Sequence, residues 1–137
     1  MSVVQKSCVK PEVVKRLADQ YKESFPAIIY FYRPKKRASS DAKIIVGTER
    51  PDQVLVKLKN GSWCKVKYLY EGTCKFSAGL YAINPEPFVL EVNQGQNYYI
   101  KCQMLSKGLK LMAELEVVDR WAAEHHMNGL EEQVSPI

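Results

Sequence analysis

Long apolar runs are missing from this 137-residue chain. None approaches the roughly 20 residues that a membrane-spanning helix requires, so we expect no transmembrane segment. The stretch Met1 to Cys8 has neither a long apolar core nor a small-residue cleavage site. The sequence as it stands therefore predicts a cytoplasmic protein, and the cell envelope or periplasm is the alternative if a signal peptide was trimmed.

Motifs for metal, phosphate and nucleophilic chemistry are also missing. The chain has no Cys-x-x-Cys pair, no Gly-rich phosphate loop and no paired-carboxylate motif. Its two histidines, His125 and His126, are adjacent in a segment expected to be helical, where a solvated face explains them. We therefore expect no catalytic residue, no metal and no cofactor, and we expect that the protein is not an enzyme.

Basic residues are only in modest excess, with a net charge of +5. Their one real cluster follows an apolar segment and consists of Arg33, Lys35, Lys36 and Arg37. A solvated loop is the ordinary interpretation of such a cluster. The alternative is that the loop from Arg33 to Arg37 binds an anion or a nucleic acid, although nucleic acid is not the expected partner.

Apolar and polar residues alternate along much of the chain, and this pattern is typical of half-buried strands. It predicts strands over residues 27–33, 43–48, 54–58, 62–69, 73–78, 88–92, 96–104 and 109–118.

Three short segments that end in glycine separate these strands, at residues 59–61, 70–72 and 93–95. Such loops are typical of three-residue hairpins closed by a glycine in the left-handed region. If so, the apolar side chains of paired strands lie directly opposite each other on one face of the sheet, in the pairs Val56 with Cys64, Val66 with Phe76, and Leu90 with Tyr98. A fourth hairpin, at residues 105–108, would pair Cys102 with Leu111.

About eight short strands with frequent turns predict a mainly β fold, an antiparallel two-sheet β-sandwich of the Ig-like or prealbumin-like kind. Helices are expected over residues 11–23, with Pro11 at the first position, and over residues 120–128, with Asp119 as N-cap and Gly129 as stop. Residues 1–130 would form a single domain with its core at 27–118, and residues 131–137 a flexible tail.

Strand parity also assigns faces. The hairpin registers place Cys64, Cys74 and Cys102 inside, where we expect reduced thiols. They place Tyr98 inside and Tyr99 outside. A second apolar patch is expected on the outer face, formed by Ile29, Phe31, Trp63 and Met112. We expect the two terminal helices to cover this patch with apolar stripes, Val14, Leu17 and Tyr21 on one helix, and Trp121, Ala122 and Leu130 on the other.

Four ordered motifs carry a family resemblance: Tyr30-Phe31-Tyr32-Arg33-Pro34, Leu58-x-Asn60-Gly61-Ser62-Trp63, Glu71-Gly72-Thr73, and Gly95-Gln96-x-Tyr98-Tyr99-Ile100. Together they resemble the bacterial family termed domain of unknown function 2846, over residues 27–118. The resemblance implies a small β-sandwich of bacterial origin, often an envelope lipoprotein. It implies no activity, cofactor or catalytic residue.

These observations favour a non-enzymatic bacterial structural or accessory protein that acts through contacts with a protein partner. The surfaces we expect to serve are an unpaired sheet edge, the basic loop, and the outer patch if the helices leave it partly open. The candidate interaction residues are Phe31, Trp63, Arg33, Lys35, Lys36 and Arg37. A sheet edge would also allow an oligomer.

Overall fold

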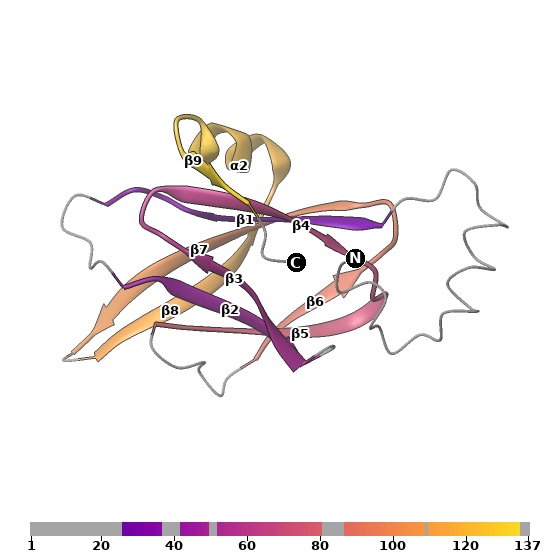
Figure 1. The fold of residues 1–137 in the computed structure, drawn as a ribbon, viewed down its shortest axis with the longest axis horizontal. Coiled ribbons are helices and arrows are strands. Elements are labelled where there is room, and N and C mark those ends of the chain that lie inside the picture. Colours follow the sequence, from indigo (N-terminus) through magenta and orange to yellow (C-terminus); the bar gives the residue numbers. More distant parts are fainter. Residues whose placement is uncertain (1–25, 37–41, 50–51, 81–86, 109, 135–137) are drawn as a thin grey trace, which may run out of the picture.

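The computed structural model describes residues 26–36, 42–49, 52–80, 87–108 and 110–134, and these form two β-sheets and one helix (Figure 1). The five-stranded sheet contains, in spatial order, β8 (Lys110–Val118), β7 (Asn97–Lys107), β1 (Ala27–Arg33), β4 (Ser62–Tyr68) and β9 (Glu131–Gln133). The four-stranded sheet contains β3 (Asp52–Leu58), β2 (Ile44–Glu49), β5 (Gly72–Gly79) and β6 (Phe88–Val92). The helix is α2 (Arg120–Met127).

The two sheets pack face to face around one apolar core, so the expected mainly β, two-sheet sandwich is confirmed. The expectation of wholly antiparallel pairing is wrong, because β1 pairs with β7 and β4 pairs with β9 in parallel. Each of the eight predicted strands is present within two or three residues of its expected ends. Phe31 of β1 meets Phe76 of β5 edge-on, with ring centroids 6.3 Å apart, and Tyr68 of β4 lies 5.4 Å from the same ring. These contacts between aromatic rings join the sheets directly.

The three predicted Gly-closed hairpins are wrong as strand pairings. The chain passes from one sheet to the other between β3 and β4, between β4 and β5, and between β6 and β7. Gly61, Gly72 and Gly95 do have positive φ angles, of 75°, 98° and 80°, as the loops predicted. Two strands that face each other across a sandwich put their apolar sides on the same core, just as two strands of a hairpin do. Matching faces therefore could not distinguish the two connections.

The central strand of the larger sheet is β1, whose neighbours are distant in sequence. It pairs antiparallel with β4, with Phe31 opposite Cys64, and parallel with β7, with Phe31 opposite Ile100. The outward position predicted for Ile29 and Phe31 is therefore wrong, because both are fully buried in the core between the sheets. Both faces of β1 carry large apolar residues, so its sequence does not alternate and did not fix which face turns inward.

The predicted hairpin between β7 and β8 exists, but its register differs. Cys102 lies opposite Leu115 rather than Leu111, and Lys107 lies opposite Lys110. The difference is an even number of residues, so every side chain keeps the face that the sequence predicted.

The end of the described chain is ordered as a strand, which corrects the predicted flexible tail over residues 131–133. β9 pairs parallel with β4, with Ser62 opposite Glu131. The amide of Gln133 also holds the turn between β3 and β4. Its Oε1 accepts from the backbone N–H of Lys59 at 2.9 Å, and its Nε2 donates to the carbonyl of Lys57 at 2.9 Å. The predicted helix over residues 11–23 lies outside the described residues.

Candidate functional site: an aromatic groove beneath the C-terminal helix

The outer face of the five-stranded sheet carries a row of aromatic side chains at its centre. Tyr30 of β1 lies opposite Tyr99 of β7, and their rings stack with centroids 4.8 Å apart and planes 7° apart. On the side of Tyr30 away from Tyr99, the ring of Trp63 of β4 follows, with its centroid 6.1 Å from that of Tyr30. Outward side chains on three adjacent strands thus form a continuous aromatic surface.

The helix α2 lies across this surface. Asp119 caps it, its carboxylate accepting the N–H of Ala122 at 2.9 Å, so the helix begins where the sequence predicted. Ala123 is fully buried against the sheet, with Met127 and Leu130 packed beside it. Because Ala123 has only a methyl group, the helix axis sits close to the rings below.

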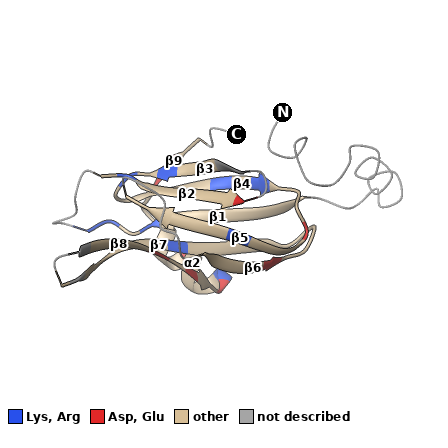
Figure 2. Cartoon of the chain, turned by 90° about the horizontal axis from the view of Figure 1, so that it is seen from below, with Lys and Arg blue, Asp and Glu red and all other residues tan. Residues whose placement is uncertain are grey.

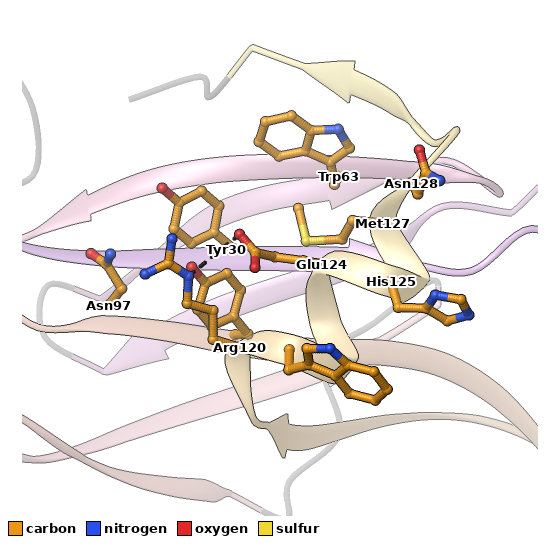
Figure 3. A pocket seen from close by; sticks show the side chains of 10 residues that line it. Tyr30, Trp63, Asn97, Arg120, Glu124, His125, Met127 and Asn128 are labelled. Atoms are coloured by element: carbon orange, nitrogen blue, oxygen red, sulfur yellow. Dashed lines mark hydrogen bonds and ion pairs between the residues drawn. The ribbon is translucent and has the colours of Figure 1, made fainter.

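An open groove of about 620 Å³ remains between α2 and the aromatic surface, and we call it the α2 groove (Figure 3). The sheet contributes Tyr30, Trp63, Asn97 and Tyr99. The helix and the residue after it contribute Arg120, Trp121, Glu124, His125, Met127 and Asn128. A second hollow of about 350 Å³ shares Asn97, Tyr99 and Arg120 and extends toward the ends of β7 and β8.

Charge is present at the groove as one exposed ion pair. The guanidinium of Arg120 lies 3.4 Å from the carboxylate of Glu124, one helical turn further on, and both side chains are more than half exposed. In Figure 3 both side chains extend from α2 toward Tyr30. An exposed pair of this kind adds about 0.3–0.5 kcal/mol to the helix, so either member is available to exchange partners.

The side chain of Tyr32 joins the helix to the sheet beneath it. Its hydroxyl lies 2.8 Å from Nδ1 of His126. Burial, followed by the charges of Glu116, Cys102 and Asp119, raises the pKa of Tyr32 to about 12. The phenol therefore keeps its proton at neutral pH, and it donates to Nδ1 when the imidazole is neutral and carries its proton on Nε2. This bond fixes one side of α2.

Trp121 differs from the other aromatic residues at the groove because its side chain is 80% exposed. Its ring stacks on His125, with centroids 6.3 Å apart and planes 9° apart. Of the predicted covering stripe, Trp121 is therefore wrong, whereas Leu130 does pack beside the sheet, together with Ala123 and Met127, which the stripe did not include. Residues two apart on a helix point about 200° from each other, so a buried Ala123 requires Trp121 to face solvent.

Of the predicted interaction residues, Trp63 is the one that lines the groove. It is half-buried and outward-facing, as expected. Phe31 is buried in the core and offers no surface to a partner. Tyr30 and Tyr99 take its place beside Trp63. The outward position that strand parity predicts for Tyr99 is confirmed. Its burial to 7% exposure beneath α2 was not predicted.

The predicted basic cluster does not form a single surface among the described residues. Arg33 is only 2% exposed, and its Nη1 donates to the carbonyls of Ala42 and Leu58, each at 2.8 Å. Burial lowers the pKa of its guanidinium. Lys35 and Lys36 are exposed, and Arg37 lies outside the described residues. Figure 2 shows lysine and arginine on several strands of both sheets rather than at one place.

The buried thiols match their predicted places. Cys64, Cys74 and Cys102 are all buried. Burial raises the pKa of Cys102, since apolar surroundings disfavour the thiolate. In the described part of the chain, no three His, Cys, Asp or Glu residues lie together as a metal site.

No helix in the described ranges is both long and apolar enough to cross a bilayer. Neither the family models, nor the curated proteins, nor the solved structures compared with this chain give a match.

Proposed function

We propose that this chain is a non-enzymatic β-sandwich module, of Ig-like or prealbumin-like type, that binds a protein partner at the α2 groove. One observation carries the proposal: Trp121 is 80% exposed at the rim of a groove that has an aromatic floor. An exposed tryptophan loses apolar contact with water only when a partner covers it, and no described segment of the chain does so.

The residue types at the groove are those that dominate protein interfaces. Tryptophan, tyrosine and arginine are enriched among hot spots, where truncation to alanine costs about 2 kcal/mol or more. The groove has all three, in Trp63 and Trp121, Tyr30 and Arg120. Of these, Tyr30 and Trp63 are already ordered by packing on the sheet, so binding would cost little side-chain entropy for those two residues.

The polar groups around the groove indicate what the partner offers. Asn97 and Asn128 present amides at opposite ends, and the pair of Arg120 with Glu124 lies between them. A partner loop with an apolar or aromatic side chain at its tip, flanked by amides or by one carboxylate, satisfies this arrangement. The groove is open rather than enclosed, which favours a protruding loop over a small molecule that needs near-complete burial.

The wider assignment rests on the sequence. The resemblance to the bacterial domain of unknown function 2846 supports a structural or accessory role without catalysis. We propose a cytoplasmic location, because Cys102 is a buried free thiol and reduced thiols are usual there. The alternative of anion or nucleic-acid binding by residues 33–37 has less support, since Arg33 is committed to backbone carbonyls.

Site-specific photo-crosslinking tests the proposal. A photoreactive phenylalanine analogue replaces Trp121 in one protein and Val89 in a control. Val89 is 52% exposed and lies on β6 of the other sheet. In cells of the source organism, position 121 should give a discrete adduct with one protein, and position 89 should not.

The cross-linked protein is then purified and titrated against the wild type and against Trp121→Ala. We expect Trp121→Ala to raise the dissociation constant at least tenfold. The circular dichroism spectrum and the melting temperature of the variant should equal those of the wild type. Val89→Ala should bind like the wild type. Equal cross-linking from both positions, or an affinity unaffected by Trp121→Ala, would refute a partner site at the α2 groove.

A further inference from the structure

The chain has two Asn-Gly pairs, and the fold gives them different surroundings. One is Asn60-Gly61, in the turn between β3 and β4, and the other is Asn128-Gly129, at the end of α2. Asparagine is a thermolabile residue, and the backbone nitrogen of a following glycine approaches its side chain most easily, because glycine has no Cβ in the way. The two pairs are equivalent in sequence, so a difference in their reactivity must come from the fold.

The side chain of Asn60 is held by two hydrogen bonds. Its Oδ1 accepts from the backbone N–H of Lys36 at 2.9 Å, and its Nδ2 donates to the carbonyl of the same residue at 2.9 Å. Gly61 is also closely packed, since a Cβ there would lie 3.1 Å from the side chain of Lys35. The side chain of Asn60 can therefore turn toward the nitrogen of Gly61 only if both bonds to Lys36 break.

Asn128 lacks these restraints in the described part of the chain. Its side chain is exposed and makes no hydrogen bond to a described residue. The N–H of Gly129 likewise has no described partner, and a Cβ at Gly129 would meet nothing within 4 Å. The bonds that hold this backbone run from the N–H of Asn128 to the carbonyl of Glu124, at 3.2 Å, and from the N–H of Leu130 to the carbonyl of Met127, at 2.9 Å. They belong to the last turn of a helix, which frays readily.

We propose that Asn128 is a site of spontaneous deamidation, at which the backbone nitrogen of Gly129 attacks Cγ of Asn128. Rotation about the Cα–C bond of Asn128, whose ψ is 121°, must first bring the two atoms together. The new C–N bond closes a succinimide ring, the bond from Cγ to Nδ2 breaks, and ammonia leaves with the proton that the Gly129 nitrogen gives up. Water then opens the ring at either carbonyl and leaves aspartate or isoaspartate at position 128. One water is consumed and one ammonia is released, with no oxidation or reduction.

The products weaken the connection between α2 and β9. A carboxylate at position 128 lies at the C-terminal end of the helix dipole, where negative charge is unfavourable. Isoaspartate also lengthens the backbone between Met127 and Gly129 by one carbon atom. Leu130, which packs on the outer face of the sheet, and the N–H of Glu131, which donates to the carbonyl of Gly61 at 3.1 Å, follow directly after this link. This effect does not require a partner at the α2 groove.

Ageing of the full chain tests the proposal. Native protein is incubated at mildly alkaline pH and digested at low pH. Peptides that contain positions 60 and 128 are then compared by mass spectrometry, and an isoaspartyl methyltransferase detects isoaspartate. We expect deamidation to be about tenfold faster or more at position 128 than at position 60, because two hydrogen bonds must break before Asn60 reacts. In urea, the control, the two rates should become similar.

Asn128→Gln separates the modification from other effects of ageing, because glutamine cyclises with the following nitrogen far more slowly. The backbone N–H groups of Leu130 and Glu131 should exchange with deuterated water faster after ageing of the wild type, and at an unchanged rate after ageing of this variant. Unchanged exchange in the modified wild type would refute the weakened connection.

Equal rates at positions 60 and 128 in the native protein, or a difference that persists in urea, would overturn the proposed site. So would an intact Asn128 in native protein under conditions that modify the unfolded chain. The absence of a partner at the α2 groove would change none of these results.

Discussion

Ionisation of Tyr32 should destabilise the fold above pH 10. Its phenol is fully buried, and its pKa is raised from 10.0 to about 12, chiefly by desolvation. The folded state thus holds this proton more tightly than the unfolded state, and the resulting stability is fully present below pH 10. It is lost as the pH rises from 10 to 12, since the unfolded state ionises first. With about 1.4 kcal/mol per pKa unit, the loss amounts to about 2–3 kcal/mol.

Urea unfolding at a series of pH values, followed by circular dichroism, measures this loss. Tyr32→Phe keeps the ring and removes the titrating group, so its stability should fall less steeply over the same interval than that of the wild type. At neutral pH the variant should be about 1 kcal/mol less stable, because the hydrogen bond to His126 is lost. Parallel alkaline slopes in the two proteins would refute the burial of Tyr32 as the cause.

Three further predictions concern other parts of the fold. Arg33→Lys should lower the free energy of unfolding by about 2–3 kcal/mol, because an ammonium does not reproduce the charged hydrogen bonds to two backbone carbonyls. The control Lys35→Met should change the free energy of unfolding little. Equal effects of the two substitutions in urea titrations would contradict this prediction. Gln133→Ala should cost about 1–2 kcal/mol and speed proteolysis at the chain end, while the exposed Glu132→Ala should do neither. The thiol of Cys102 should react with a disulfide reagent only at the rate of unfolding, and rapid labelling of native protein would show that it is accessible.

Strand positions were predictable from the sequence because alternation is a local property. A half-buried strand must place every second side chain in the core, whichever strand lies beside it. The pairing of strands is not local in the same way. β1 lies between β4 and β7, and no turn connects it directly to either. The Gly-closed loops correctly predicted that the chain reverses direction at Gly61, Gly72 and Gly95. They did not predict which strand the following strand pairs with.

The groove was predictable in part. Trp63 was correctly placed on the outer face, but Phe31 was assigned the wrong face because β1 is apolar on both sides. The exposure of Trp121 had a usable signal. Asp119 fixes the start of the helix, and the phase that buries Ala123 and Met127 leaves Trp121 outward. The groove itself depends on packing distances between α2 and β7, which a sequence pattern does not encode.

The central place of β1 has a consequence for synthesis of the chain. β1 leaves the ribosome before either of its neighbours, and β7 emerges only after five other strands. β4 can pair with one edge of β1 earlier, but until β7 emerges the other edge of the apolar segment Ala27–Arg33 has no partner strand. Such a segment, rich in β-branched and aromatic residues, is prone to pair with other nascent chains. The larger sheet is therefore completed late in synthesis, and we expect rapid docking of β7, or a chaperone that holds β1, to limit aggregation of the newly made chain.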